Sequence, residues 1–390
     1  MKKRIQLYPV EGKEKEPIEG RWKRALALIL GSTERVTVGL DVHKKTYAVA
    51  VMLGEEELVA EWVQPADADV LIRRLERIKD RIGTVVYEAG PTGFGLARRL
   101  RARGLNAQVV APSQTPRTSG KRPKTDRLDG RALARLGAKR ELRYVYVPTE
   151  EEEAERQVIR TREQIKDRLR KVKVQIKSFL EMHGIPEPSG LKNWSRRGED
   201  ALRGLALREE LRWVLDMHLS ELAHQKEQLV QANGRTAALA QTERHEGNVK
   251  RGRSVPGVGE LTAVTFAVEM PSMGRFGNGR VVGRYLGLAP GIHDSGEQSR
   301  ACGVMKDGNG RLRTLLIEAA WRWIQNDEGA RATYRRLVSN TGESNKAITA
   351  MARRLGVLLW RLMTREEDYR IREASGAEGP ALEPGVPAAV

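Results

Sequence analysis

Residues 35–112 begin with three extended segments and continue with alternating helical and extended segments, an order that few folds accommodate. "RVTVGLDV", "TYAVAVML" and "ELVAEWVQP" are short runs rich in β-branched residues, and they predict strands. "DADVLIRRLERIKDR" and "TGFGLARRLRARG" predict helices, and "GTVVYEAG" and "NAQVVAP" predict the strands that follow them. A meander of three strands followed by this alternation predicts a mixed sheet with helices packed on it.

The rest of the chain divides by pattern into further segments. Residues 1–34 form a basic extension around a short apolar run, "ALALIL". After the sheet domain of residues 35–148, residues 149–246 predict long helices, and residues 247–368 predict a second, mainly helical domain. Residues 369–390 have the composition of a disordered tail. The expected class is therefore α/β plus α.

The helical region carries a heptad seam. Apolar residues follow one another at steps of four, three, four and three at Ile165, Leu169, Val172, Ile176 and Phe179. A second helix repeats leucines at 211, 215, 222 and 229, with His218 and Gln225 at the seam positions between them. Two antiparallel helices of one chain and a dimerising coiled coil both fit this pattern.

Charge narrows the class of partner. The 390 residues include 69 Lys plus Arg and 51 Asp plus Glu, which gives a formal net charge of +18. Such an excess favours nucleic acid over a membrane surface, because no amphipathic anchor or lipidation signal is visible. The single cysteine, Cys302, excludes an internal disulfide, and no apolar run is long enough for a membrane span. We expect a cytoplasmic, nucleoid-associated protein.

Four carboxylates are placed so that they can converge. The order of elements matches a ribonuclease-H-like fold, in which Asp41 and Glu88 end neighbouring strands. Asp126 and Asp129 lie three residues apart, on one face if "TDRLDGRALARL" is a helix. Each acid alone is more often a cap or a solvated residue, but the joint placement favours a metal site. All-oxygen ligation suits Mg²⁺ or Mn²⁺, and two ions about 4 Å apart can act on a phosphodiester. Cations that could hold the backbone flank the pair, among them Lys121, Arg122 and Lys124.

Several motifs together resemble a known family. "GLDVHKKTYAVAV", "VYEAGPTGFGLARRL" and "KTDRLDGRALARL" are similar to the amino-terminal domain of the DEDD insertion-sequence transposases of the IS110 family. "SVPGVGELTAVTFAVEM" and "GRYLGLAPGIHDSGEQSRACGVMKDGNGRLRTLLIEAAW" resemble the carboxy-terminal transposase domain of that family. The resemblance covers most of residues 36–330.

The resemblance implies an RNA-guided recombinase. It implies a RuvC-like domain whose tetrad here is Asp41, Glu88, Asp126 and Asp129, a coiled-coil insertion, and a serine-bearing domain. It also implies a structured non-coding guide RNA, the bridge RNA, which pairs with donor and target DNA. Dimers and tetramers of the protein would assemble on these nucleic acids.

Ser295 in "PGIHDSGEQ" is the expected nucleophile only through this resemblance. From the residues alone a turn serine before Gly296 is the better interpretation, since nothing nearby in sequence establishes an activating base. The family pattern implies a covalent phosphoserine intermediate, strand exchange and religation without ATP. Ser299 is the rival nucleophile and ranks lower.

Two further elements are candidate nucleic-acid contacts. "VPGVGELTA" is typical of a helix-hairpin-helix turn, in which Gly257 and Gly259 let backbone N–H groups approach a phosphate. A simple turn between helices fits nearly as well. "KDGNGRLRTLL" supplies Lys306, Arg311 and Arg313, which are suited to gripping a DNA strand. Met305 stands where the family often has Ser or Thr, which removes a hydroxyl contact there.

Two other functions fit parts of the sequence. A Holliday-junction resolvase or related RuvC-like nuclease would use the tetrad to hydrolyse phosphodiesters with water. An inactive RNA-binding or scaffold protein on a nuclease-like fold would tolerate Asp41→Ala in every assay other than metal binding, but the intact tetrad argues against it.

Overall fold

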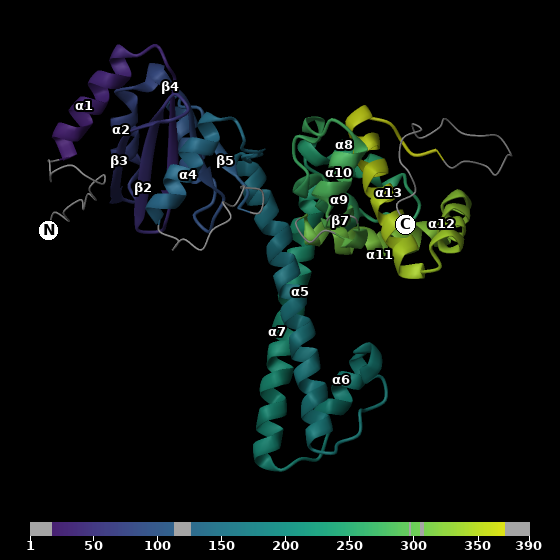
Figure 1. Ribbon diagram of the computed structural model, residues 1–390. Helices are drawn as coiled ribbons and strands as arrows, with labels where there is room; N and C mark the ends of the chain where they lie inside the picture. The colour runs from purple at the N-terminus through teal and green to yellow at the C-terminus, as the bar shows by residue number, and fades with distance from the viewer. Residues whose placement is uncertain (1–17, 113–125, 296–297, 305–307, 371–390) are drawn as a thin grey trace. The chain divides into compact units, whose positions relative to one another are not determined.

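The computed structural model describes residues 18–112, 126–295, 298–304 and 308–370. The chain forms two compact units, Met1–Thr149 and Glu150–Val390, which we call the sheet unit and the helical unit (Figure 1). The predicted residues Lys121, Arg122, Lys124 and Lys306 lie outside the described residues, as does Met305.

The sheet unit is built on one mixed sheet of six strands in the order β3-β2-β1-β4-β5-β6. Central β1 pairs antiparallel with β2 and parallel with β4, and β5 continues parallel to β4. The first five strands are those that the sequence predicts, and β6 is an additional short strand. The bounds are β1 Val36–Val42, β2 Thr46–Leu53, β3 Glu57–Pro65, β4 Ile82–Glu88, β5 Ala107–Val110 and β6 Tyr144–Val145.

Helices cover both faces of this sheet. One face packs against α1 (Ile18–Gly31), α2 (Ala68–Glu76) and α3 (Gly95–Ala102) in a single apolar core. The other face carries α4 (Asp126–Ala138), which lies against β1 and β2 (Figure 1). Side chains alternate between these faces along each strand, so Val38 and Leu40 enter the first core, whereas Thr37 and Gly39 face α4.

Helix α1 corrects the interpretation of residues 1–34 as an extension. Trp22, Ala25, Leu26 and Ile29 are buried in the core of the sheet unit, and the Trp22 and Trp62 rings make an edge contact at 5.3 Å. The helix belongs to the sheet unit because these apolar residues recur on one helical face and cover β3.

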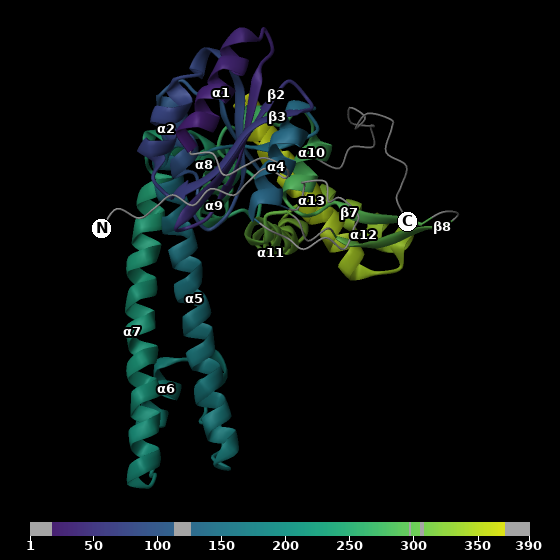
Figure 2. The same cartoon turned by 60° about the vertical axis from the view of Figure 1, so that its left-hand side comes forward.

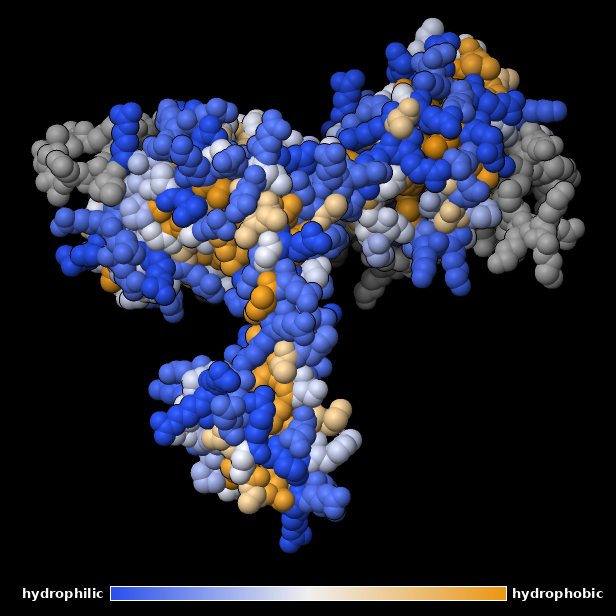
Figure 3. Space-filling view, turned by 180° about the vertical axis from the view of Figure 1, so that it is seen from behind, coloured by the Kyte–Doolittle hydropathy of each residue, from blue (hydrophilic) through white to orange (hydrophobic). Residues whose placement is uncertain are grey.

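The helical unit begins with an antiparallel pair of long helices, α5 (Glu150–Met182) and α7 (Glu209–Ala240), shown side by side in Figures 1 and 2. All five predicted seam residues of α5 are buried, and four of them, Leu169, Val172, Ile176 and Phe179, share one core with Leu215, Leu219 and Leu222 of α7. The sequence left two arrangements open, and the structure forms this seam within one chain. Figure 3 shows hydrophobic residues running along this helix pair.

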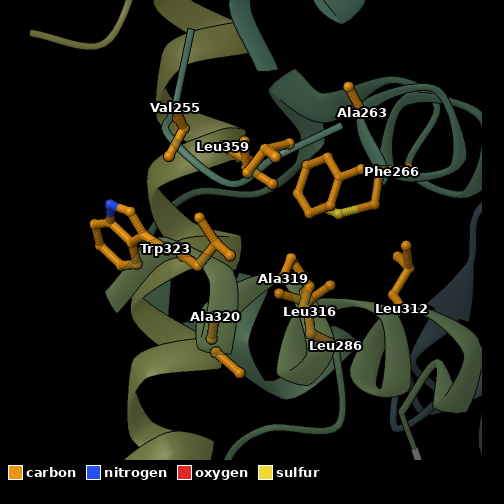
Figure 4. Packing of buried hydrophobic residues seen from close by; sticks show 14 of the residues in the cluster. Val255, Ala263, Phe266, Leu286, Leu312, Leu316, Ala319, Ala320, Trp323 and Leu359 are labelled. Atoms are coloured by element: carbon orange, nitrogen blue, oxygen red, sulfur yellow. The ribbon is translucent and has the colours of Figure 1, made fainter. Parts of the chain in front are cut away.

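The remaining elements of the helical unit surround a second large core. Phe266, Leu286, Leu316 and Leu359 point toward one another in it (Figure 4). None of the helices in the described ranges has the length and apolar character of a membrane span. The bounds are η2 Leu191–Asn193, α6 Arg196–Arg203, α8 Glu243–Arg253, α9 Glu260–Glu269, η3 Met273–Arg275, α10 Gly279–Tyr285, β7 Pro290–Ser295, β8 Gln298–Val304, α11 Gly310–Asn326, α12 Glu328–Thr341 and α13 Ser344–Arg365.

Candidate active site

The two strand-end acids lie on neighbouring parallel strands and on the same face. The register pairs Leu40 of β1 with Tyr87 of β4, one residue before Asp41 and Glu88. Leu40 and Tyr87 both enter the core beneath α1–α3. Because side chains alternate along a strand, Asp41 and Glu88 face the side of the sheet that carries α4. Neighbouring strands lie about 4.8 Å apart, so the two acids are close at the carboxyl edge of the sheet.

Helix α4 brings its first turn to this same edge. A Cβ on Gly137 would lie 3.1 Å from the Thr37 side chain, whereas one on Gly130 would lie 3.7 Å from the Asp41 nitrogen. The helix therefore runs antiparallel to β1, with its first residues over the end of the strand. Asp126 and Asp129 are both in this part of α4.

The described side chains give part of the site. The Asp41 carboxylate is 18% exposed, and its Oδ2 lies 3.1 Å from Nε2 of His43. Glu88 is half-buried and Asp129 is exposed, whereas for Asp126 only the helical backbone is described. Among the side chains that the structure describes, no three His, Cys, Asp or Glu residues form a group that could hold a metal ion. Convergence of all four acids therefore stays a prediction, which depends on Asp126.

Gly39 sets the distance between α4 and β1. A Cβ at this position would lie 2.2 Å from the carbonyl oxygen of Gly130 and 2.4 Å from the backbone nitrogen of Ala134. Only a residue without a side chain lets the helix approach so closely. The sequence signal was a glycine inside an apolar strand, which is typical of a close backbone approach.

Gly39→Ala is expected to lift α4 from the sheet, because the atoms that it would meet are backbone. We expect a loss of about 2 kcal/mol in the free energy of unfolding, together with a large loss of DNA cleavage. Urea unfolding and a cleavage assay measure the two effects. Gly95→Ala is the matched control, since a Cβ there meets nothing within 4 Å. Wild-type cleavage by Gly39→Ala would contradict this role.

A nearly buried ion pair fixes the rotation of α4. Nε and Nη2 of Arg131 lie 2.8 and 2.6 Å from the two carboxylate oxygens of Glu61 on β3, whose side chain is 4% exposed. Such a two-point contact holds both groups in one geometry. Arg131 is one of the cations that flank the acidic pair, and it serves the fold through this contact. Nothing in the sequence linked it to Glu61.

Ser295 lies at the end of a two-stranded hairpin that the sequence analysis did not predict. Strands β7 and β8 pair antiparallel, and Ser295 lies opposite Gln298. The register also pairs Asp294 with Ser299. The serine is therefore the last residue of β7, and its side chain is outside the described part.

The glycine turn between α8 and α9 has a packing reason. Gly257 has φ +86°, and a Cβ on it would lie 2.6 Å from the carbonyl carbon of Arg322 on α11. This residue must be glycine both for its backbone conformation and for the contact with α11. Gly259 precedes α9, and a Cβ added to it would meet no atom within 4 Å. The geometry favours a turn between helices at 257 and leaves 259 open to a ligand.

The predicted DNA-gripping arginines make contacts within the helical unit. Nε of Arg311 lies 2.6 Å from Oε2 of Glu163 on α5, and Nη1 of Arg313 donates to the Gly287 carbonyl at 3.0 Å. Burial raises the pKa of Glu163, and Arg311 opposes that shift. Both arginines position the first turn of α11, just after the hairpin.

Glu269 is a buried carboxylate that ties three helices together. Its side chain is 1% exposed and accepts hydrogen bonds from Nε and Nη2 of Arg160 at 3.1 and 3.3 Å. It also accepts one from Nδ2 of Asn309, the residue that caps α11, at 3.1 Å. No pattern in the sequence pointed to this residue, which lies inside an apolar helix.

Glu269→Ala is expected to lower the free energy of unfolding by about 3 kcal/mol, because it leaves Arg160 without its carboxylate. Chemical unfolding of the full chain measures this. The control is Glu187, an exposed acid that pairs with Lys177. Glu187→Ala is expected to lower the free energy of unfolding by less than about 1 kcal/mol. Equal losses in the two variants would show that Glu269 contributes no more than a surface pair.

A mixed sheet with acids at the ends of adjacent parallel strands, in a chain of net charge +18, is typical of an enzyme that acts on nucleic acid. Comparison with known proteins agrees. Residues 38–184 match the DEDD transposase model of the IS110 group, described as "Transposase", and residues 250–335 match "Transposase IS116/IS110/IS902 family".

Relatives extend the match over most of the chain. The y4qE protein of Sinorhizobium fredii, named as a transposase, is 35% identical over 83% of this chain and 87% of its own length. The transposase for insertion sequence element IS1111A of Coxiella burnetii is 27% identical, over 74% of this chain and 80% of its own length. The transposase for IS1533 of Leptospira borgpetersenii is 28% identical, over 74% and 85%.

The chain belongs to the IS110 family of DEDD transposases. Membership implies an enzyme that binds and cuts DNA, and the DEDD domain suggests dependence on a divalent metal.

Proposed function

We propose that this transposase is an RNA-guided recombinase that cuts and rejoins DNA strands through a covalent phosphoserine intermediate on Ser295. The observation that supports the acidic half of this proposal is the close packing of α4 on β1, with Gly130, in the first turns of α4, next to the backbone of Asp41. The strand order, with an antiparallel meander followed by parallel strands, supports a ribonuclease-H-like, RuvC-like assignment.

The donor set at this edge fits a hard divalent cation. Carboxylate oxygens are the ligands that Mg²⁺ and Mn²⁺ prefer, and the Asp41 side chain is 18% exposed. Asp41, Glu88, Asp126 and Asp129 would hold the metal. When bound, Mg²⁺ or Mn²⁺ would neutralise the phosphate charge and stabilise the attacking and leaving oxygens.

The serine carries the covalent chemistry in this proposal. Its Oγ loses a proton and forms a bond to phosphorus, while the phosphorus–oxygen bond to the leaving strand breaks and the released hydroxyl gains a proton. Attack by the hydroxyl of another strand reverses these changes and frees Ser295. The bond energy is retained in the phosphoserine, so no ATP is required.

The assembly completes the proposal. Ser295 acts beside the acidic tetrad of another protomer, so that cutting awaits a dimer or tetramer on donor and target DNA. A structured guide RNA, the bridge RNA, supplies the sequence choice. The sheet domain (35–148), coiled-coil region (149–246) and serine-bearing domain (247–368) work together on nucleoid DNA in the cytoplasm. Residues 121, 122, 124, 257, 259, 306, 311 and 313 are proposed to contact nucleic acid.

Denaturing electrophoresis tests the recombinase chemistry. With Mg²⁺ and duplex DNA carrying the element ends, we expect a protein–DNA species that survives detergent and disappears after protease treatment. Addition of EDTA should abolish it. Cut DNA with free ends and no attached protein would instead identify a RuvC-like hydrolase or resolvase.

Sequencing the RNA that copurifies with the protein from its host tests guidance. Loops complementary to the element ends and to the target are expected. Recovery of ribosomal fragments alone would contradict guidance without affecting the covalent step.

A further inference from the structure

Three helices of the helical unit carry an unbalanced positive charge. Helices α10, α12 and α13 contain ten Lys and Arg residues and one acid, Glu328. Helix α5 of the same unit contains nine Lys and Arg residues and eight Asp and Glu residues. The imbalance is therefore local to α10, α12 and α13, and these helices cannot neutralise their own charge.

Packing gathers part of this charge around two consecutive arginines of α13. Helix α13 contacts both α10 and α12. The Arg353 side chain crosses α10 at the buried Gly283. A Cβ added to Gly283 would lie 2.7 Å from Nε and 3.3 Å from Cγ of Arg353. Besides loss of hydration, the charge of Arg280 on α10 lowers the pKa of Arg353, and the charges of Arg336 on α12 and of Arg353 lower the pKa of Arg354. Gly283 thus leaves the space that seats one guanidinium beside others.

This arrangement is unfavourable in the free protein. Loss of hydration and the neighbouring arginines lower the pKa of Arg353 and of Arg354. Within the described ranges, no carboxylate lies at ion-pair distance from either guanidinium. The half-buried Arg160, in contrast, has Glu269 at 3.1 Å. Like charges held together without a counter-charge are stabilised when an external anion binds.

We propose that Arg280, Arg336, Arg353 and Arg354 form a binding site for the sugar-phosphate backbone of duplex DNA. Guanidinium groups present planar pairs of donors that match phosphate oxygens. Their spread over three helices suits successive phosphates of one strand better than a single small anion. Duplex DNA is the polyanion that a transposase must hold. The site goes beyond the catalytic proposal, because it requires neither the acidic tetrad nor Ser295.

Binding of a labelled DNA duplex to the full-length protein tests this site. Fluorescence anisotropy is measured in EDTA, which prevents cleavage, at several KCl concentrations. The double variant Arg353→Gln, Arg354→Gln is expected to bind roughly tenfold more weakly. The slope of log affinity against log salt should fall by about 1.8, since two phosphate contacts are lost.

Two further variants distinguish the effect of the position of Arg353 from the effect of net charge. Gly283→Ala keeps every charge but displaces Arg353, and we expect a smaller loss of affinity with a slope reduced by about 0.9. The control Arg170→Gln, Arg203→Gln removes two exposed arginines that pair with Asp167 and Asp200, which leaves the net charge equal to that of the test variant. Its affinity and slope should stay near those of the wild type.

Thermal melting shows whether weaker DNA binding results from a destabilised fold. Removal of mutually repelling arginines is expected to leave the melting temperature unchanged or to raise it. The proposal is overturned if the Arg353→Gln, Arg354→Gln variant keeps wild-type affinity and slope, if the control loses as much, or if weaker binding accompanies a lower melting temperature. A loss seen with a structured RNA probe but not with duplex DNA would assign the cluster to RNA and overturn the DNA site. Because the assay contains EDTA, failure of the covalent chemistry leaves its outcome unaffected.

Discussion

Replacement of Ser295 by alanine is expected to remove the covalent protein–DNA species completely and to lower strand exchange by a factor on the order of 10⁴ or more. The residue is the last of β7, and alanine keeps the Cβ of the side chain and removes only the hydroxyl. Folding and DNA binding should therefore stay unchanged. Denaturing electrophoresis and a melting curve measure the two properties on the same preparation.

Ser299→Ala is the matched control for this substitution. Ser299 lies in β8 of the same hairpin, opposite Asp294, and differs from Ser295 in its place relative to the turn. We expect wild-type levels of the covalent species from this variant. If Ser299→Ala removes the species and Ser295→Ala does not, the nucleophile has been assigned to the wrong serine. If both variants still cut DNA, water is the nucleophile and the protein is a hydrolase.

Asp41→Asn is expected to reduce DNA cleavage by roughly three orders of magnitude. Asparagine keeps the shape of the side chain but removes the charge that would hold a divalent cation, and a bound metal supplies several kcal/mol of transition-state stabilisation. DNA binding in EDTA should stay equal or become slightly tighter, since one negative charge is lost next to the phosphate.

Glu57→Gln is the control for Asp41→Asn. Glu57 is an exposed acid at the start of β3, and the same loss of charge there should leave cleavage unchanged. Cleavage rates across a Mg²⁺ titration measure both variants. Wild-type cleavage by Asp41→Asn would refute the acidic site, and absence of cleavage in the wild type as well would favour a scaffold protein.

The periodicity of short segments was enough to predict much of the sheet unit. Five of its strands and the positions of Asp41 and Glu88 at strand ends follow from alternation and from the glycines that end each run. Helix α1 was missed although Trp22, Ala25, Leu26 and Ile29 have helical spacing, because the exposed Leu28 and Leu30 make the run continuously apolar and hide that spacing. The β7–β8 hairpin was missed because its segments lack the alternation of a half-buried strand.

For the long helices, too, the sequence predicted one feature and left another open. The seam from Ile165 to Phe179 was readable because one helix alone determines which side chains share a face. The helix that packs against this seam could not be predicted, because a heptad seam packs equally well against a helix of the same chain or of another chain. The structure pairs α5 with α7 within the chain.

The sequence by itself was enough to recognise the family, to predict the first five strands of the sheet, and to place Asp41 and Glu88 at strand ends, since these features depend on residues close together in the chain. Only the tertiary structure decided that Gly39 admits α4, that Arg131 contacts Glu61, and that Arg353 of α13 packs against Gly283 of α10. Such contacts join residues tens of positions apart, and they depend on how complete elements pack, which local patterns do not encode.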